Sequence, residues 1–526
     1  MKTIRHLKKS AILTCAILIL ITLTTCTSNF TDSARTRSGS GSLNARYVFY
    51  FIGDGMGPVQ IHATEAYLAS LVDGYNDSKT NMEKTKNLSF RDFPAFGMAT
   101  TYAANRFITD SAAAGTALAC GEKTLIDTIS MGTDRNTPYT TIAELAKAKG
   151  MKVGIVTSQG VDHATPAVFY AHEANRNSYY NIGVQLANSD FDYFAGGSLH
   201  EPAQRTTRRR RSAAAGESVE RKNTYDVAKE NGFKVVTSRE ELDNCKPGER
   251  IIAYNKAEES KNALNFEIDR PDDCVSLAEF TAKGIALLDN DKGFFMMVEG
   301  GLIDTVCHRN DAVTAFHETI AFDEAIKEAA EFYKQHPNET LIVITADHET
   351  GGMSIGYGTS YDTAFELLKN QKMSQERFID TVLSKYSSGQ WNGVEDNIPD
   401  GLKADITEAF GLVYDRLNPY EKDLLENAYD KHMSNTKHMR MTINKFRQQD
   451  QLLYDDKIII DKNPFGVTLT RTLNNKAGIG WPSLAHTGTP VEVHAIGVGY
   501  ENFNGFYDNT DIPKKMAKIM GVNLDN

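Results

Sequence analysis

Polar residues follow directly after several apolar runs of this sequence, at points where strands would end. The run YVFYFI is followed by GDG, FFMMV by EGGLID, and LIVIT by ADHETGG. In open α/β sheets, ligands bind beyond the carboxyl ends of the strands. We therefore expect five side chains to converge on one crevice: Asp54, Glu299, Asp304, Asp347 and His348.

These residue types are suited to binding metal ions. Asp304 and His308 are four residues apart in IDTVCH, so on a helical turn they face the same way and can hold one metal. Carboxylate oxygen together with imidazole nitrogen suits zinc, whereas Asp54 and Glu299 with a hydroxyl group suit magnesium. The sequence thus predicts a site for more than one kind of metal ion.

A second chemical feature is the stretch TDSAAAGTALACGEKT, residues 109–124. Asp110 or Ser111 is expected to cap a helix here, and the small residues that follow let that helix pack closely against a sheet. The same helix end presents free N–H groups and positive potential to an anion. Ser111 is therefore a candidate nucleophile towards phosphate, with an ordinary helix cap as the alternative.

The elements that must position these residues follow from the alternation of short apolar runs with helical patterns. This alternation predicts an α/β fold with a large, mostly parallel sheet and helices on both faces. Helical periodicity is clearest over residues 276–288 and 312–333. The predicted strands are residues 47–52, 152–157, 294–298, 341–345 and 491–498.

The pattern changes from about residue 358 to about residue 475. Polar, helix-prone segments such as SQERFIDTVLSKY and PYEKDLLENAYDKHM replace the strand-like runs, which resume at Val491. We interpret this segment as a helical insertion that serves as a lid over the site or as an interaction surface.

Composition excludes some classes of protein. The chain has 526 residues, of which 41% are hydrophobic and 24% charged, as expected of a globular protein. The net charge of -11 argues against nucleic acid as a general partner, because phosphate backbones require a basic face. Beyond the N-terminus, Cys120, Cys245, Cys274 and Cys307 lack the CxxC spacing of zinc sites. A disulfide between Cys245 and Cys274 is one pairing that the sequence leaves open.

The N-terminus is typical of an export signal. Basic residues precede an apolar stretch over residues 11–23, which is short for a membrane span. The stretch ends in LTTC, which resembles a bacterial lipoprotein box with Cys26 as the lipidated residue. A Ser/Gly-rich tether follows. We therefore expect an exported protein of the periplasm or outer membrane, anchored by lipid at Cys26.

The chain resembles the alkaline phosphatases through six motifs that occur in the order of that family. These motifs are FIGDGMG, TDSAAAGTALACG, QGVDHATPAVFYAHEANR, MMVEGGLIDTVCH, TADHETGG and AHTGTP. The resemblance implies Ser111 as the nucleophile and Arg176 as the guanidinium that binds two phosphate oxygens. It places His163 where some bacterial relatives have Asp, which is similar to the animal enzymes.

The resemblance also implies two zinc ions and one magnesium ion. The implied ligands are Asp304, His308 and His486 for one zinc; Asp54, Asp347 and His348 for the other; and Asp54, Thr165 and Glu299 for the magnesium. Thr305 departs from the family, whose members commonly carry Lys, His or Trp there, so the affinity for phosphate is expected to differ.

The activity that the resemblance implies is hydrolysis of phosphate monoesters through a phosphoserine intermediate. The alternatives are a phosphodiesterase or sulfatase of the same superfamily, and a surface lipoprotein that binds phosphate or metal without turnover. A homodimer is compatible with the sequence, which gives neither the oligomeric state nor the natural ester. The expected organisation is a signal (1–26), a tether (27–45), a catalytic domain (46–511, with the insertion at about 358–475) and a C-terminal segment (512–526).

Overall fold

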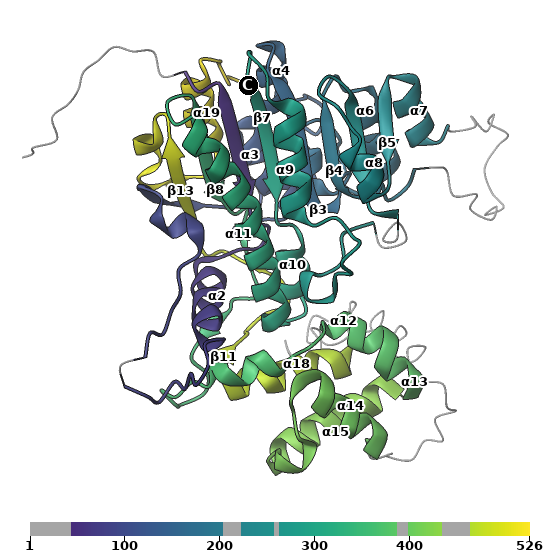
Figure 1. Cartoon of the computed structure of the whole chain (residues 1–526), viewed down its shortest axis with the longest axis vertical. Coiled ribbons are helices and arrows are strands. Elements are labelled where there is room, and N and C mark those ends of the chain that lie inside the picture. Colours follow the sequence, from purple (N-terminus) through teal and green to yellow (C-terminus); the bar gives the residue numbers. More distant parts are fainter. Residues whose placement is uncertain (1–43, 81, 203–221, 257–261, 387–397, 434–462) are drawn as a thin grey trace, which may run out of the picture. The chain divides into compact units, whose positions relative to one another are not determined.

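The computed structural model describes residues 44–80, 82–202, 222–256, 262–386, 398–433 and 463–526. Its centre is a 10-stranded sheet (Figure 1). In spatial order the strands are β14 (Gly505–Asp508), β2 (Ala95–Thr100), β13 (Val491–Gly497), β8 (Thr340–Thr345), β1 (Tyr47–Ile52), β7 (Phe294–Glu299), β3 (Lys152–Gly160), β4 (Tyr193–Gly197), β6 (Arg250–Tyr254) and β5 (Phe233–Val236).

The sheet is mostly parallel, and β13 alone runs antiparallel to both of its neighbours. β1 lies between β8 and β7, and all six of its residues are buried because the sheet is covered on both faces. The register aligns Ile52 with Glu299 on one side and with Thr345 on the other. The carboxyl ends of these three strands are therefore level with one another.

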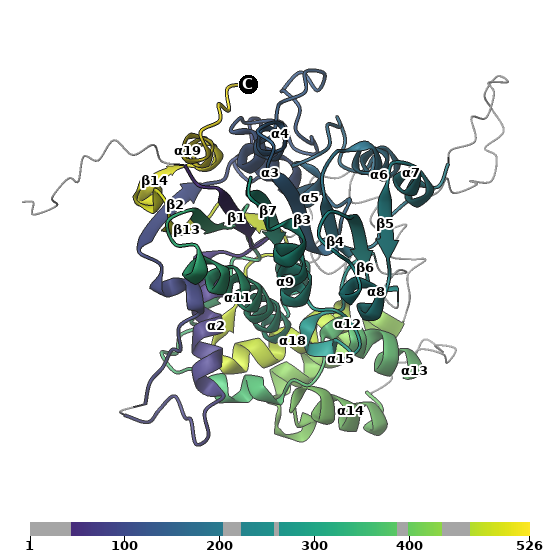
Figure 2. The ribbon, with the colours of Figure 1, turned by 45° about the horizontal axis from the view of Figure 1, so that its top comes forward.

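Helices cover both faces of the sheet, which confirms the predicted fold class. α9 (Leu277–Leu288) and α11 (Ala312–Gln335) lie on one face, and α3 (Ser111–Cys120), α4 (Ile142–Ala148) and α5 (Ala164–Ala167) lie on the other (Figure 2). Other helices of this part are α2 (Pro58–Ser70), α6 (Tyr179–Asn188), α7 (Thr224–Glu230), α8 (Arg239–Asp243), α10 (Leu302–Cys307) and α19 (Asp511–Met520). Short 3₁₀ turns are η1 (Ser89–Asp92), η3 (Glu267–Asp269) and η7 (Tyr500–Phe503).

The five predicted strands and both predicted helices are present, with bounds that differ by at most three residues. The other strands of the sheet were not predicted. β4, with the sequence YFAGG, shows the reason: its small residues give no apolar run, and its burial depends on neighbours that are distant in sequence.

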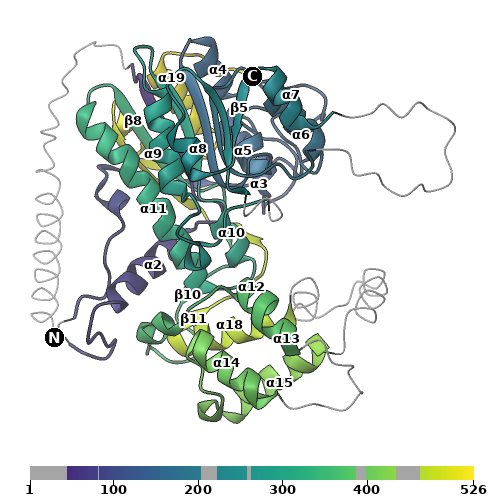
Figure 3. The same cartoon turned by 45° about the vertical axis from the view of Figure 1, so that its right-hand side comes forward.

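The segment predicted as an insertion is mainly helical in its described part. Its elements are η4 (Phe365–Asn370), α12 (Gln375–Phe378), η5 (Ile379–Leu383), α13 (Ser384–Tyr386), α14 (Asp400–Phe410), η6 (Tyr414–Arg416), α15 (Pro419–Met433) and α18 (Pro464–Ala477), which lie together in Figure 3. They share a second apolar cluster with parts of α2 and α11, separate from the core around the sheet.

The predicted export signal, Cys26 and nearly all of the tether lie outside the described residues. Within the described part, no helix has both the length and the apolar character needed to cross a membrane. The disulfide left open for Cys245 and Cys274 is absent, and both side chains are buried.

Candidate metal centre

The level ends of β1, β7 and β8 bring acidic residues together at one edge of the sheet. Asp54 follows β1, Glu299 ends β7, and Asp347 follows β8, each with a fully buried side chain. Gly55 has a φ of 71°, a conformation that glycine adopts at no steric cost, and its N–H donates to Oδ1 of Asp347 at 3.2 Å. The turn after β1 therefore fixes the carboxylates of Asp54 and Asp347 beside each other.

A first group of ligand atoms consists of Asp304, His308 and His486. Asp304 and His308 lie on successive turns at α10, and Nε2 of His308 is 3.2 Å from Oδ2 of Asp304. His486 comes from β12 (His486–Thr487), which pairs with β9 (Glu349–Thr350), and its Nε2 is 3.4 Å from Oδ1 of Asp304. The predicted grouping of these three residues is thus present as a cluster of side chains; we name it the Asp304 corner.

The two imidazoles of the Asp304 corner have their tautomers fixed by backbone carbonyls. Nδ1 of His308 donates to the carbonyl of Leu484 at 2.6 Å, and Nδ1 of His486 donates to the carbonyl of Thr109 at 2.9 Å. In the neutral form of each ring, Nε2 then has a lone pair, and these two atoms lie only 3.1 Å apart. Two lone pairs at this distance repel unless a proton or a cation lies between them, so the arrangement fits a metal ion.

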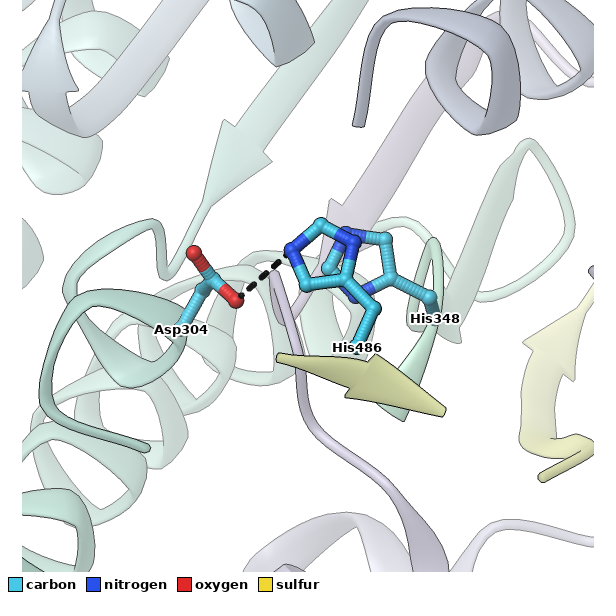
Figure 4. Close-up of side chains that lie close together, drawn as sticks. All are labelled: Asp304, His348 and His486. Atoms are coloured by element: carbon cyan, nitrogen blue, oxygen red, sulfur yellow. Dashed lines mark ion pairs between the residues drawn. The ribbon is translucent and has the colours of Figure 1, made fainter. Parts of the chain in front are cut away.

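His348 lies between the Asp304 corner and the other carboxylates. Its ring stacks on that of His486 with centroids 3.5 Å apart, and Figure 4 shows the two rings beside Asp304. The ligand atoms of Asp304, His348 and His486 lie within 4.8 Å of one another. The hydroxyl of Thr350 donates to Oδ1 of Asp304 at 2.5 Å, which orients that carboxylate.

Two further groups have the spacing of metal ligands. Asp54, Asp347 and His348 form one, as predicted, and Asp54, His163 and Glu299 form the other. The hydroxyl of Thr165, another residue predicted for the magnesium site, is 3.3 Å from Oδ2 of Asp54. His163, which the resemblance had already placed among the site residues, therefore lies with Asp54 and Glu299 in this group.

Burial and mutual repulsion shift the pKa values of these carboxyl groups. Burial, followed by the charge of Asp347, raises the pKa of Asp54 well above its usual range, and burial raises the pKa of Glu299 to about 8. Burial also acts to raise the pKa of Asp304, but His308 and His486 outweigh it and hold that pKa well below the usual range. Such a concentration of buried acid is costly unless cations compensate it.

The fit to cations is supported by buried polar atoms that have no hydrogen-bond partner among the described residues. These atoms are Oδ1 of Asp54, Oδ2 of Asp347 and Oε1 of Glu299. Buried polar atoms in native proteins are nearly always satisfied. Their gathering at one place, with the donor types that zinc and magnesium prefer, fits metal ions as the missing partners.

Ser111 begins α3 and faces this group. Asp110 is the N-cap, since its Oδ1 accepts from the N–H of Ala113 at 3.0 Å, and this decides between the two predicted caps. The hydroxyl oxygen of Ser111 lies 3.2 Å from Nε2 of His348. Ser111 is therefore free of the capping role and lies at the helix end beside the ligand atoms.

Arg176 lies on the same side as Ser111. Its Nη1 donates to Oδ2 of Asp110 at 3.1 Å, and its Nη2 is 3.3 Å from Nε2 of His163. Burial, then the charge of Arg176, lowers the pKa of His163 to about 3, so this ring is neutral at ordinary pH. Asp110 and His163 thus hold the guanidinium by two of its nitrogens.

Sequence reasoning missed several residues that orient the site. Nε2 of Gln159 donates to the hydroxyl of Thr305 at 2.7 Å, the hydroxyl of Thr157 donates to Oε2 of Glu299, and Thr350 binds Asp304. Hydroxyl and amide side chains of this kind are common throughout the chain and form no local pattern. Only Thr350 in ADHETGG, two residues after the predicted ligand His348, had a position that could have suggested its role.

Comparisons with known proteins agree with this geometry. A family model described as alkaline phosphatase matches residues 45–522. Alkaline phosphatase 3 of Bacillus subtilis is 30% identical over 500 residues, which are 94% of this chain and 92% of that protein. Alkaline phosphatase 4 of the same species is 30% identical and covers 90% of this chain and 88% of its own length.

Solved structures show the same fold. The crystal structure of a cold-active alkaline phosphatase from the psychrophile Shewanella sp. matches with a TM-score of 0.69 and 29% identity, over 90% of this chain and 99% of that one. The Thermus thermophilus alkaline phosphatase matches with a TM-score of 0.70 over 92% of this chain and 94% of that one. Its 24% identity supports the fold alone.

Proposed function

Because the chain belongs to the alkaline phosphatase family, we propose that it hydrolyses phosphate monoesters through a phosphoserine intermediate on Ser111. The observation that carries the proposal is the position of the Ser111 hydroxyl, at the start of α3 and 3.2 Å from His348, beside the clustered ligand atoms. A helix N-terminus favours the approach of an anion, and the small residues of α3 leave room for it.

In the first step, Oγ of Ser111 forms a bond to phosphorus while the bond between phosphorus and the ester oxygen breaks. The proton of the Ser111 hydroxyl passes, through water, to the ester oxygen, which leaves as an alcohol. In the second step, water attacks the phosphoserine, inorganic phosphate departs, and the Ser111 hydroxyl is restored.

Arg176 binds the phosphoryl group in both steps. Its guanidinium presents N–H groups in a fixed fork that matches two phosphate oxygens. Asp110 and His163 hold that fork in place, and Asp110 also keeps the pKa of Arg176 above its usual value against the effect of burial. The guanidinium is therefore charged and oriented before substrate arrives.

We propose two zinc ions and one magnesium ion as cofactors. When bound, they would act as Lewis acids that lower the pKa of a neighbouring hydroxyl or water and stabilise negative charge on the phosphoryl group. The residues proposed to hold them are Asp304, His308 and His486 for one zinc; Asp54, Asp347 and His348 for the other; and Asp54, Thr165 and Glu299 for magnesium, with His163 next to that site.

The test compares wild-type protein with Ser111→Ala on an aryl phosphate monoester. Turnover should fall by several orders of magnitude while the metal content stays nearly intact, because Ser111 is a nucleophile first. Acid quenching with phosphorus-labelled substrate should leave label on Ser111 of the wild type alone. Ser130→Ala is the control, since this buried serine binds the carbonyl of Val168 and contacts no proposed ligand.

The same assay separates the alternatives. Faster turnover of an aryl phosphate diester or an aryl sulfate than of the monoester would favour a phosphodiesterase or a sulfatase. Binding of phosphate without turnover would favour a non-catalytic lipoprotein, and label on a residue other than Ser111 would contradict the proposed nucleophile.

We also propose that the protein is exported and anchored by lipid at Cys26, on the support of the sequence of residues 1–26. Growth with a labelled fatty acid should label the wild type but not Cys26→Ser. A homodimer is proposed as the assembled form, and sedimentation of the purified protein measures it.

A further inference from the structure

Residues 308–311 form the short turn between α10 and α11, and His308 is its first residue. Side chains and backbone groups of the helical segment make hydrogen bonds to this turn. The backbone carbonyl of Arg309 accepts from Nε2 of Gln375 at 3.3 Å, and the guanidinium of Arg309 lies 2.5 Å from the carboxylate of Glu376. The carboxylate of Asp311 accepts from the backbone N–H of Gln375 and from Nε2 of Gln371, both at 2.8 Å. Residues on both sides of the turn's centre are thus held by η4 and α12.

The centre of this turn is Asn310, which is fully buried and has a φ of 50°. Its Nδ2 donates to the carbonyl of Cys307 at 3.0 Å and to that of Ser483 at 2.8 Å. Its Oδ1 accepts from Nε of Arg471 at 2.8 Å, and its own carbonyl accepts from Nδ2 of Asn474 at 2.7 Å. One side chain therefore joins α10, the loop before β12, and α18.

The loop that Asn310 holds is the one that orients both histidines of the Asp304 corner. Ser483 precedes Leu484, whose carbonyl accepts from Nδ1 of His308 at 2.6 Å. The same loop continues into β12, which begins with His486. A shift of this loop would change the direction of the first imidazole and the position of the second.

We propose that Asn310 is a positioning residue that fixes His308 and His486 at a metal-binding separation and so sets the affinity of the Asp304 corner for zinc. The proposal rests on the proposed function, since it requires that zinc binds there. The proposal also assigns a role to the helical segment. Arg471 and Asn474 of α18 make hydrogen bonds to Asn310, and α18 thereby helps to hold the Asp304 corner in place.

Asparagine is suited to this position for two reasons. It adopts positive φ more readily than most residues with a side chain. Its amide also supplies a double donor for the two carbonyls and an acceptor for Arg471 at the same time. Glycine would keep the backbone conformation but lose all three side-chain hydrogen bonds, so Asn310→Gly isolates the contribution of the amide.

The test measures zinc affinity directly. Metal-free wild type and Asn310→Gly are titrated with zinc against a chromophoric chelator, and His308→Ala identifies the step that belongs to the Asp304 corner. Loss of a residue that orients metal ligands typically weakens metal binding by about 10- to 100-fold. We expect a weakening of about that size in Asn310→Gly for this step alone.

Asn255→Ala is the control. Asn255 is a buried asparagine that binds both the N–H and the carbonyl of Val275, away from the ligand groups. Its loss should lower stability without changing zinc affinity. Arg471→Ala removes the hydrogen bond between Arg471 and Asn310 while leaving Asn310 in place. It should weaken zinc binding at the Asp304 corner about threefold, on the scale of one hydrogen bond. This variant decides the question if Asn310→Gly does not fold.

Unchanged zinc affinity in Asn310→Gly, or an equal loss in Asn255→Ala, would overturn the proposal. If Asn310→Gly does not fold, unchanged affinity in Arg471→Ala would overturn it in the same way. A wild type that binds no zinc would instead reject the proposed cofactors, so the two failures are distinguishable.

Discussion

At the scale of single residues, Thr305 is the position where the resemblance leads us to expect a departure from the family. The side chain follows Asp304 in α10, is half-buried, and accepts a hydrogen bond from Gln159. Neither Thr305 nor Gln159 carries a charge, so Arg176 supplies the positive charge among the side chains that we propose to bind phosphate. Inhibition by inorganic phosphate should accordingly be weak for this family.

Introducing Thr305→Lys should tighten the binding of inorganic phosphate by about 1 kcal/mol, or roughly fivefold in the inhibition constant, the scale of a partly solvated charge contact. Turnover should fall or stay level, because tighter product binding slows release. Thr305→Met is the matched control of similar length without charge. An inhibition constant that is unchanged in the lysine variant, or equally changed in the methionine variant, contradicts this account.

Glu318 provides a pH-dependent prediction away from the ligands. Burial raises its pKa from 4.5 to about 8, and it accepts from the N–H of Glu267 at 2.6 Å. Between those two pH values the folded state holds a proton that the unfolded state has lost, so stability must fall as pH rises. Each pKa unit corresponds to about 1.4 kcal/mol.

Urea unfolding at about pH 5 and about pH 8 measures the effect. Between these two pH values, the free energy of unfolding of the wild type should fall by a few kcal/mol more than that of Glu318→Gln, which cannot ionise. Glu331→Gln, on the same helix with an exposed side chain, should behave as the wild type does. Parallel pH profiles for wild type and Glu318→Gln would show that Glu318 is ionised in the folded protein.

At the scale of elements, β9 and β12 form a short antiparallel pair beside the metal ligands. β9 begins directly after His348, and β12 begins with His486. Glu349, the first residue of β9, is buried, and its carboxylate accepts from Nε2 of Gln60, the N–H of Gly352 and the hydroxyl of Thr487. Both of its oxygens therefore face donors only, which keeps the two strands together.

Replacing Glu349 by Gln turns one acceptor into a donor that faces other donors. The free energy of unfolding should fall by about 2 kcal/mol, the penalty of a buried unsatisfied polar group. Thr487→Val removes a single donor and should cost about 1 kcal/mol. Chemical denaturation of the three proteins checks this; a Glu349→Gln variant as stable as the wild type would mean that the ladder is held by other contacts.

The elements also show what could be predicted from the sequence. β1, β7 and β8 are buried on both faces, so each is an unbroken apolar run followed by a polar turn, and both features are local. The order of these strands is not local, because β1 lies between two strands that come much later in the chain. Asn310 was missed for the same reason: its partners Ser483 and Arg471 are distant in sequence.

At the scale of the whole molecule, the metal centre concentrates electrostatic repulsion at the end of a sheet that is otherwise apolar. Asp54, Asp347 and Glu299 are fully buried and come from three adjacent strand ends. Without cations, some of these groups must take up protons, as the raised pKa of Glu299 indicates. Metal binding should therefore stabilise the entire fold in addition to enabling the reaction.

Removal of metal by a chelator should thus inactivate the protein and lower its unfolding temperature together. A cation present at about 100 times its dissociation constant adds about 2.7 kcal/mol to the stability of the folded state. Zinc and magnesium together should restore more activity than either alone, because imidazole-containing and all-oxygen ligand groups are both present.

Activity assays and thermal unfolding before and after metal addition measure these effects, with elemental analysis of each sample. Full activity in a sample that elemental analysis finds free of metal would reject the three-metal site. Such a result would leave His348, itself a proposed ligand, as the side chain whose contact with the Ser111 hydroxyl could activate it.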